Sequence, residues 1–423
     1  MKRKFTSYSL ADFYQFKNQL LKFGKRFSNF CFLDNHHYDF DKTFECVAGF
    51  GVIKSLVASS SNSLQQIDQF KSENTDWIFG HLSYDLKNEI EGLSSKNQDH
   101  IGFEDFYFFV PEIVFILSRE SVNIGADETI STKDIFEKIV SITASENTFT
   151  KAELKSKFSK EEYLATVKKL QQHILRGDCY EICFCQEFFA ENIHIDPIAV
   201  FKKLSSISPN PFSAFYKSSE KYLMCASPER FLKKTNDLII SQPIKGTSKR
   251  STFSDEEEKS LLKSNEKERA ENIMIVDLVR NDLSKICVEG SVSVKEFLEI
   301  YSFPQVHQMI STIAGKLAEN VSLSDIFYAT FPMGSMTGAP KKRVLELIEM
   351  YEKTKRGLFS GSVGYITPSG DFDFNVVIRS ILYNEKSKYL SIPAGSAITW
   401  KSDAEKEFEE CELKIEGMKK ALE

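Results

Sequence analysis

Apolar residues fall in short runs along this chain, and turn residues separate one run from the next. Examples cover residues 179–190, 212–217, 221–227 and 238–244. Runs of this kind, joined by short turns, predict strands in a mainly antiparallel sheet. A regular alternation of strand and helix is absent from the sequence, which disfavours a Rossmann fold or a barrel. The pattern therefore predicts an α/β (α+β) fold with antiparallel sheets packed around helices.

Three longer segments predict helices, over residues 159–177, 254–286 and 402–423. Each begins with a serine that is followed three residues later by a glutamate, which is the pattern of a capping box. Gly177 is placed to end the first of these helices. The serine and glutamate pairs are Ser159–Glu162, Ser254–Glu257 and Ser402–Glu405.

The chain has 423 residues, more than one simple core usually holds, so two regions are expected. The polar, charge-rich stretch 141–163 is the best candidate boundary. We expect an N-terminal region over residues 1–150 and a second region over 155–420. The most apolar segment, 106–117, is short and contains Glu112, so it predicts a pair of buried strands.

Composition excludes several classes of protein. The net charge of −6 lacks the basic character of a nucleic-acid-binding protein. The sequence contains no run of 18 or more uncharged apolar residues and no apolar stretch of a secretory signal near its start, so we expect neither a membrane span nor export. Eight scattered cysteines without a CxxC pair are typical of free thiols in a reducing, cytoplasmic protein.

A predicted hairpin places two ionisable residues together. Its turn lies at residues 235–237, and pairing about Asn236 puts Glu229 opposite Pro243. Lys245 is then the diagonal neighbour of Glu229 on the same sheet face. This arrangement is compatible with an ordinary cross-strand ion pair or with an acid and an amine that act together in catalysis.

Two predicted helices each carry glutamates three residues apart, a spacing that keeps both side chains on one face. Four carboxylates from two helices suit a hard cation with oxygen ligands, and Mg²⁺ is the expected choice. Two solvated helix faces are the alternative interpretation. The residues are Glu268 and Glu271 on one helix, and Glu407 and Glu410 on the other, with Lys414 one turn further on.

Three further features suggest a ligand site. The glycine-bearing loop 331–340 runs into a helix, and its free N–H groups suit a carboxylate, although a capped turn has the same pattern. Arg379 lies in an otherwise apolar run and needs a partner anion. Gly395 would let a ligand approach the backbone closely.

Taken in order, ten blocks between residues 159 and 418 resemble the chorismate-utilising enzymes, which include anthranilate, aminodeoxychorismate, isochorismate and salicylate synthases. The blocks are RGDCYEICFCQEF, ASPERFL, QPIKGT, ERAENIMIVDLVRNDLSKI, VHQMISTIAG, FPMGSMTGAPKKRVLELIE, RGLFSGSVGYI, VVIRSIL, IPAGSAI and EKEFEECELK. The N-terminal region resembles the family more weakly, through GHLSYD.

The resemblance implies the sandwich fold of anthranilate synthase component I and a site for Mg²⁺ and chorismate. It assigns catalysis to Lys245 and Glu229, and it assigns the metal to the four glutamates named above. The positions implied to hold the substrate are Gly246, Thr247, Gln308, Thr337, Tyr365, Arg379, Gly395 and Lys414.

Two positions distinguish members of the family. The lysine that activates water in the isochorismate and salicylate synthases is replaced here by Glu181. Lys245 stands where anthranilate synthases usually have alanine and aminodeoxychorismate synthases have lysine. The resemblance thus implies 4-amination of chorismate for 4-aminobenzoate and folate synthesis. An anthranilate synthase is the nearest alternative, and an inactive, partner-binding subunit is another.

In the implied reaction, Glu229 protonates the departing 4-hydroxyl and a neutral Lys245 adds at C2. Ammonia then adds at C4 and expels the lysine. Since no glutaminase is recognised in the chain, we expect ammonia to come from a separate glutamine amidotransferase subunit. The chain departs from the family pattern at Gln308, Ala397 and Met333.

Overall fold

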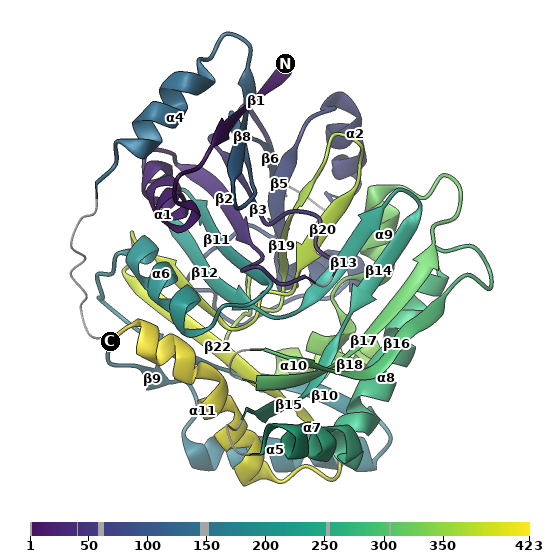
Figure 1. The fold of residues 1–423 in the computed structure, drawn as a ribbon. Helices are drawn as coiled ribbons and strands as arrows, with labels where there is room; N and C mark the ends of the chain where they lie inside the picture. The colour runs from purple at the N-terminus through teal and green to yellow at the C-terminus, as the bar shows by residue number, and fades with distance from the viewer. Residues whose placement is uncertain (1, 40, 58–62, 144–151, 251–253, 304–305) are drawn as a thin grey trace.

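Two large antiparallel sheets lie face to face in the computed structural model, which describes residues 2–39, 41–57, 63–143, 152–250, 254–303 and 306–423 (Figure 1). The first sheet has the order β1 (Arg3–Ser9), β8 (Ser121–Asp127), β7 (Ile113–Leu117), β3 (Cys46–Phe50), β2 (Asn29–Asp34), β11 (Phe212–Ser218), β12 (Lys221–Ser227), β21 (Ser380–Asn384), β22 (Tyr389–Ile398), β10 (Glu181–Ala190), β18 (Gly338–Ala339), with β9 (Lys155–Ser156) beside β10. The second has the order β15 (Ile244–Lys249), β17 (Val306–Lys316), β14 (Leu238–Gln242), β13 (Arg230–Thr235), β20 (Phe372–Asn375), β19 (Ser362–Ile366), β5 (Ile78–Leu82), β6 (Phe106–Val110), β4 (Lys54–Val57), with β16 (Ser293–Ser302) beside β17.

Helices cover the outer faces of this sandwich. They are α1 (Phe13–Gly24), α2 (Gln66–Glu73), α3 (Lys87–Glu91), α4 (Thr132–Val140), α5 (Lys160–Leu175), α6 (Pro197–Ile207), α7 (Asp255–Ser264), α8 (Glu266–Ser284), α9 (Leu323–Thr330), α10 (Lys341–Tyr351) and α11 (Ala404–Ala421), with 3-10 turns η1 (Tyr84–Leu86) and η2 (Gly334–Met336). The predicted α+β fold with antiparallel sheets around helices is confirmed.

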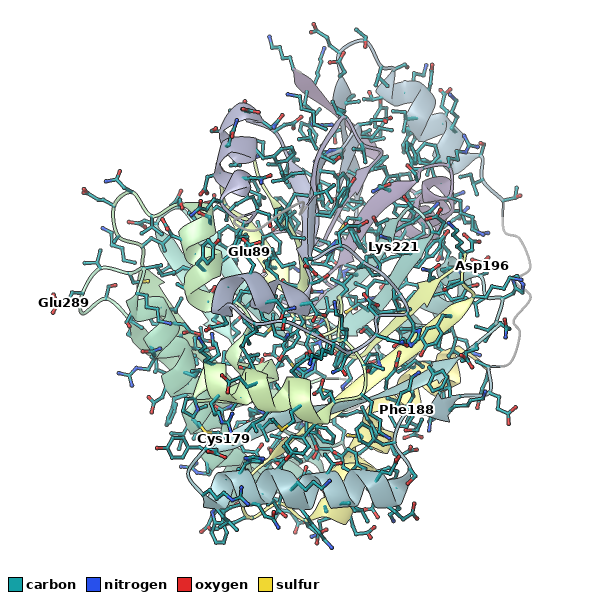
Figure 2. The ribbon with its side chains drawn as sticks, turned by 180° about the vertical axis from the view of Figure 1, so that it is seen from behind. Glu89, Cys179, Phe188, Asp196, Lys221 and Glu289 are labelled. Carbon is teal, nitrogen blue, oxygen red and sulfur yellow. The ribbon has the colours of Figure 1, made fainter. Side chains whose placement is uncertain are left out.

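Two cores hold the layers together. One core fills the space between the sheets, where a side chain at Gly49 of β3 would collide with Phe79 of β5. The other lies between the first sheet and helices that include α1, α5, α6, α10 and α11. Seen from behind, Lys221 of β12 lies above Phe188 of β10, and both strands belong to this first sheet (Figure 2).

The N-terminal and C-terminal regions share both sheets. In the first sheet β2 pairs with β11, and in the second sheet β5 pairs with β19. The predicted boundary after residue 150 borders residues 144–151, which lie outside the described residues. The division at 150–155 therefore stays a prediction from the sequence.

The apolar segment 106–117 forms two buried strands, as predicted, but these strands belong to different sheets. β6 pairs with β5 and β4, whereas β7 pairs with β3 and β8. Between them lies Pro111, which lacks a backbone N–H, and there the chain crosses from one sheet to the other.

Only one predicted capping box is present. Ser159 and Glu162 cap each other's backbone at the start of α5. The predicted helix 254–286 is instead two helices, because Asn265 breaks the run and caps α8 by accepting from two backbone N–H groups. The last helix begins with Asp403 as its cap rather than Ser402. Asn and Asp satisfy the first free N–H groups as well as Ser does.

The eight cysteines are all buried and none forms a disulfide. In the described part of the chain, no helix is long and apolar enough to cross a membrane.

Candidate active site

The hairpin of β13 and β14 positions Glu229. Its turn is tighter than predicted, because Thr235 pairs with Leu238 and only two residues make the turn. A β-bulge between Arg230 and Lys233 shifts the register by one residue, so that Arg230 faces Gln242. This is the pairing predicted from the sequence at the far end of the hairpin. Glu229, 3% exposed, therefore reaches the place expected for it.

Lys245 lies at a second irregularity, near the start of β15. The register with β17 shifts between Ile244 and Thr247, and Gly246 adopts φ +94°, a conformation that residues with side chains rarely take. A side chain at position 246 would also press on Glu268, at 3.2 Å. The bulge thus turns Lys245 inward and brings its backbone close to α8.

The ammonium of Lys245 forms its ion pair with Glu181 and not with Glu229. Lys245 Nζ donates to Glu181 Oε1 at 2.8 Å, and the Glu181 side chain is only 1% exposed. The other carboxylate oxygen, Glu181 Oε2, is buried and has no hydrogen-bond partner among the described residues. Lys245 still lies near enough to Glu229 for its charge to act on that carboxyl group.

The surroundings raise the pKa of both Glu229 and Lys245. Burial raises the pKa of Glu229 to about 7, against smaller lowering contributions that include the charge of Lys245. Burial acts to lower the pKa of Lys245, but the carboxylates of Glu181 and Glu271 outweigh it and raise that pKa above its ordinary value. Glu229 can therefore hold a proton near neutral pH, as expected. The two carboxylates that face Lys245 favour its charged form over the neutral form expected from the sequence.

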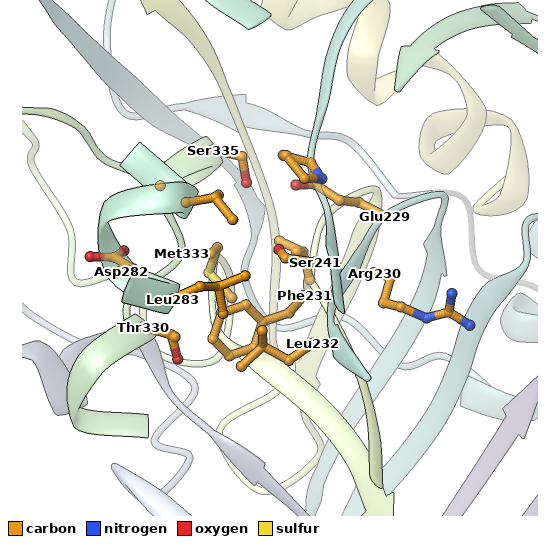
Figure 3. A pocket seen from close by; sticks show the side chains of 14 residues that line it. Glu229, Arg230, Phe231, Leu232, Ser241, Asp282, Leu283, Thr330, Met333 and Ser335 are labelled. Atoms are coloured by element: carbon orange, nitrogen blue, oxygen red, sulfur yellow. The ribbon is translucent and has the colours of Figure 1, made fainter. Parts of the chain in front are cut away.

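Two cavities adjoin these residues. One, with about 340 Å³ of unfilled space, extends from Glu229 and Ser335 towards Thr330 and Asp282 (Figure 3). The other, with about 410 Å³, is lined by Gln308 and Arg379 among others.

Three of the predicted substrate-binding residues gather at the second cavity. Thr247 is the cross-strand partner of Gln308, and the buried amide oxygen of Gln308 has no hydrogen-bond partner among the described residues. Arg379 lies just before β21 with φ +52°, and its guanidinium donates to the backbone oxygen of Lys414 at 3.3 Å. Among the described residues Arg379 forms no ion pair, so its charge suits a ligand carboxylate.

Lys414 and Gly395 are joined directly. Lys414 Nζ donates to the backbone oxygen of Gly395 at 2.7 Å and pairs with Glu410 at 2.6 Å. A side chain at position 395 would collide with the sulfur of Cys185 on the neighbouring strand β10. Protein packing therefore already requires this glycine, whether or not a ligand also approaches it.

Thr337 lies in the loop before α10 and is fully buried. Its hydroxyl contacts two carbonyl oxygens of its own loop, and its backbone oxygen accepts from Cys183 N at 2.8 Å. The loop thereby fixes β18 against β10 beside Glu181. Thr337 is near the site, but its hydroxyl is engaged within the loop.

The four predicted metal-binding glutamates come from α8 and α11, which meet through Lys267. Lys267 Nζ lies 2.8 Å from Glu407 Oε1 and 3.7 Å from Glu271 Oε1. Burial raises the pKa of Glu271 to about 8 and also raises that of Glu268. Burial alone would raise the pKa of Glu410, but Lys414 beside it lowers this pKa below its ordinary value.

With this geometry established, comparison with known proteins identifies the family. Residues 33–420 match the chorismate binding enzymes. The chain belongs to the chorismate binding enzyme family. It is 35% identical to the chloroplastic aminodeoxychorismate synthase of Arabidopsis thaliana, over 88% of this chain and 43% of that protein. It is 32% identical to aminodeoxychorismate synthase component 1 of Escherichia coli, over 85% of this chain and 81% of that one.

The fold agrees with this membership. The crystal structure of anthranilate synthase component I from Streptococcus pneumoniae superimposes with a TM-score of 0.75 at 23% identity, over 98% of this chain and 92% of that one. The predicted sandwich of anthranilate synthase component I is thereby confirmed as a fold. The chain spans less than half the length of the Arabidopsis relative.

The four glutamates of α8 and α11 have the chemistry to bind a divalent cation, but their side chains do not converge on a single point in the structure. Among the described residues, no three His, Cys, Asp or Glu side chains form a metal-binding group. Glu271 Oε1 and Glu407 Oε2 are nevertheless buried oxygens without a hydrogen-bond partner in the described residues. Buried carboxylate oxygens without a hydrogen bond are costly unless a cation compensates them. On this observation the residues fit Mg²⁺, which prefers oxygen ligands.

Tyr365 does not lie with the other predicted site residues, and its assignment to the substrate stays a prediction from the resemblance. It lies in β19 and lines another cavity, together with Asp34, Arg230 and Asp373. Its ring contacts Trp77, with the ring centres 5.8 Å apart. Arg230 belongs to the strand that leaves Glu229, yet its guanidinium points away from the acid and pairs with Asp373. A motif match gave the position of Tyr365 along the chain but not the face of its strand.

Sequence reasoning missed the pairing of Glu181 with Lys245. Glu181 drew attention only as the replacement of a lysine found in other family members. Its place at the start of an otherwise apolar strand, β10, was the available signal, because a carboxylate buried there needs a cation.

Proposed function

We propose that this chain is the chorismate-aminating component of an aminodeoxychorismate synthase, which forms 4-amino-4-deoxychorismate from chorismate and ammonia. The observation that carries the proposal is the group of Glu181, Lys245 and Glu229. It combines a buried acid that can stay protonated near pH 7 with an amine bonded to a buried proton acceptor. The relatives named aminodeoxychorismate synthase, at 31–40% identity, support it.

In the first step, Lys245 passes a proton to Glu181 and becomes a nucleophile. Its nitrogen bonds to C2 of chorismate while the ring double bonds shift and the C4–O bond breaks. Glu229 gives its proton to the departing oxygen, which leaves as water. A neutral amine is required for this attack, and its proton acceptor lies 2.8 Å away.

In the second step, ammonia bonds to C4 and the double bonds shift back. The C2–N bond breaks, and its electron pair returns to Lys245. The ammonium formed at C4 gives one proton to Glu229, and Glu181 returns to Lys245 the proton that it accepted in the first step. The overall change replaces the 4-hydroxyl by an amino group and releases one water.

The substrate's two carboxylates need separate partners. Arg379, with Gln308 and Thr247 beside it, would bind one of them by a charged, bidentate contact. Mg²⁺, when bound, would supply positive charge to the other, held by Glu268, Glu271, Glu407 and Glu410. Lys414, fixed by the backbone of Gly395, would add a further cation on that side.

We further propose that ammonia comes from a separate glutamine amidotransferase subunit. The Escherichia coli and Bacillus subtilis relatives, at 32% and 31% identity, are each named component 1, which supports an assembly with a second component. The chain alone should then use ammonium but not glutamine.

A product assay tests the proposal. The chain is incubated with chorismate, ammonium and Mg²⁺, with and without an added lyase that converts aminodeoxychorismate into 4-aminobenzoate. Formation of 4-aminobenzoate only with the lyase supports 4-amination. Fluorescent anthranilate formed without the lyase would instead show an anthranilate synthase, a name that other relatives carry. No product and no binding of chorismate would indicate an inactive subunit.

A further inference from the structure

Lys267 occupies the contact between the two helices that carry the four glutamates. Its ammonium donates to Glu407 Oε1 at 2.8 Å and lies 3.7 Å from Glu271 Oε1. Both partners are buried, with side chains 2% and 7% exposed. One positive charge thus lies between two carboxylates that come from different helices.

Only the two carboxylates favour a lysine at position 267. It is the second residue of α8, and the start of a helix repels cations because its N–H groups carry partial positive charge. Glu266 and Glu268, on either side, are the residue type that a helix start favours. The helix itself therefore gives no reason to place a lysine here.

The carboxylates remain incompletely satisfied by Lys267. Glu407 Oε2 and Glu271 Oε1 have no hydrogen-bond partner in the described part of the chain, although both are buried. A single ammonium with one hydrogen bond cannot fill the space that a divalent cation with several oxygen ligands would fill. One cation, Lys267, is thus in place, and two carboxylate oxygens can still accept a further ligand bond.

Lys267 is also free to leave, unlike the other lysine of this site. Its side chain is 37% exposed, and among the described residues its ammonium donates a hydrogen bond to the Glu407 carboxylate alone. Lys414, by contrast, is tied both to Glu410 and to the backbone oxygen of Gly395. A swing of Lys267 into water breaks its ion pairs with Glu407 and Glu271 but no backbone contact.

We propose that Lys267 is a resident internal cation, which neutralises Glu407 and Glu271 when no metal is present and which a divalent metal must displace in order to bind. The inference rests on the metal site of the proposed function. It implies that Lys267 lowers the affinity of the site for metal and, in return, stabilises the folded site when no metal is bound. Lys267 is thus a positioning residue of the site and not a catalytic one.

Metal titration of the full chain without chorismate tests this role. Binding of Mg²⁺, and of Mn²⁺ as a spectroscopic probe, is measured by calorimetry and electron paramagnetic resonance. Lys267→Met removes the competing ammonium, so metal affinity should rise roughly three- to tenfold, as expected for loss of one nearby charge at a half-exposed site. Lys267→Arg retains a cation and should bind metal no more tightly than the wild type.

Arg269→Met is the matched control. Arg269 lies two residues further along α8, about 200° around the helix, and donates to the backbone oxygen of Lys263 rather than to a carboxylate. The Arg269→Met substitution removes one positive charge from the same helix and leaves the contacts of the glutamates intact, so metal affinity should change less than twofold. An equal gain from Arg269→Met would show a general field effect and would overturn the displacement by Lys267.

Thermal melting supplies a readout independent of affinity. Without metal, Lys267→Met leaves the carboxylates uncompensated and should lower Tm, and saturating Mg²⁺ should restore it more than it raises Tm of the wild type. Unchanged or weaker metal binding by Lys267→Met would overturn the proposal. Because neither measurement uses chorismate or product, 4-amination can fail in the product assay while this inference holds, and the reverse.

Discussion

The two ends of the candidate site are built differently. Glu229, Lys245 and Glu181 are brought together by strand register and two bulges, and Lys245 is already paired with Glu181 before any ligand arrives. The four glutamates of α8 and α11 are placed by helix faces. Lys267 pairs with two of them, Glu407 and Glu271, and each of these two keeps a buried oxygen without a hydrogen-bond partner in the described residues. The acid–amine end is assembled in advance, whereas we propose that a metal ion completes the carboxylate end by displacing Lys267.

This difference teaches where rigidity and adaptability are needed. A nucleophile and an acid must meet the substrate within a narrow geometry, which a sheet provides because its register allows no gradual adjustment. A metal site can reorganise its side chains when the ion enters, since a glutamate side chain can adopt several rotamers. Changes at the first end should therefore affect chemistry, and changes at the second should affect metal binding.

Removal of the nucleophile should have the largest effect. Lys245→Ala should lower kcat for 4-amination by about a thousandfold or more, because the covalent route is lost. Chorismate binding, measured by calorimetry with Mg²⁺, should change far less. Near-normal turnover in this variant would remove Lys245 from the chemistry and leave it a structural ion pair.

Loss of the proton acceptor should come next. Glu181→Gln keeps the shape of the side chain but leaves Lys245 without a carboxylate that can accept its proton at 2.8 Å. We expect kcat to fall by about ten- to a hundredfold, the usual range for general base catalysis. Partial recovery at higher pH would support the assignment, because bulk base then deprotonates Lys245. A pH-independent loss would point to misplacement of the lysine instead.

The acid should show itself in pH dependence. Since burial raises the pKa of Glu229 to about 7, its protonated fraction falls above that pH, and kcat/KM should decline about tenfold per pH unit on the alkaline side. Glu229→Gln should lose this limb along with most activity. A profile that stays flat from pH 6 to 9 would contradict the role of Glu229.

The same group makes a prediction for stability. A carboxyl whose pKa is raised in the folded state loses stability as pH rises, from the unfolded pKa towards about 7. Glu229→Gln should therefore become more stable than the wild type as pH rises from 4 to 8, by on the order of 2–3 kcal/mol at most. Urea melts at several pH values measure this, and a constant difference would argue against a buried, proton-holding Glu229.

The smallest effect is expected from a change in the bulge between Ile244 and Thr247. Gly246→Ala forces a side chain into φ +94° and against Glu268, so it should cost about 1–2 kcal/mol of stability. It should also move Lys245 relative to Glu181, with kcat reduced more than metal affinity. Equal losses of both would show that the two ends of the site are not separable as described.

Sequence alone predicted much of this arrangement, and the exceptions have physical causes. The four glutamates, Lys245, Glu229 and Arg379 follow from spacing, hairpin geometry and motif order, and they lie where helix faces or register place them. The turn was misplaced by one residue and the bulge restored the register, because a bulge has no clear local signal. Asn265 and Asp403 replaced two predicted serine caps, since all three residue types cap helices.

What could not be predicted depended on contacts between distant elements. The pair of Lys245 with Glu181 joins a strand of one sheet to a strand of the other, and Lys267 joins α8 to α11. Tyr365 lies away from the site because its strand turns that side chain towards another cavity. Local patterns carry no information about which of several possible partners a side chain meets.

The most direct test of the central claim is mass spectrometry of the protein quenched during reaction with chorismate and Mg²⁺ in the absence of ammonia. We expect the peptide containing Lys245 to gain the mass of chorismate less one water, and the Lys245→Ala variant to show no such gain. Addition of ammonium before the quench should remove the adduct as 4-amino-4-deoxychorismate forms. Steady 4-amination with Lys245 unmodified at every quench time would contradict the account.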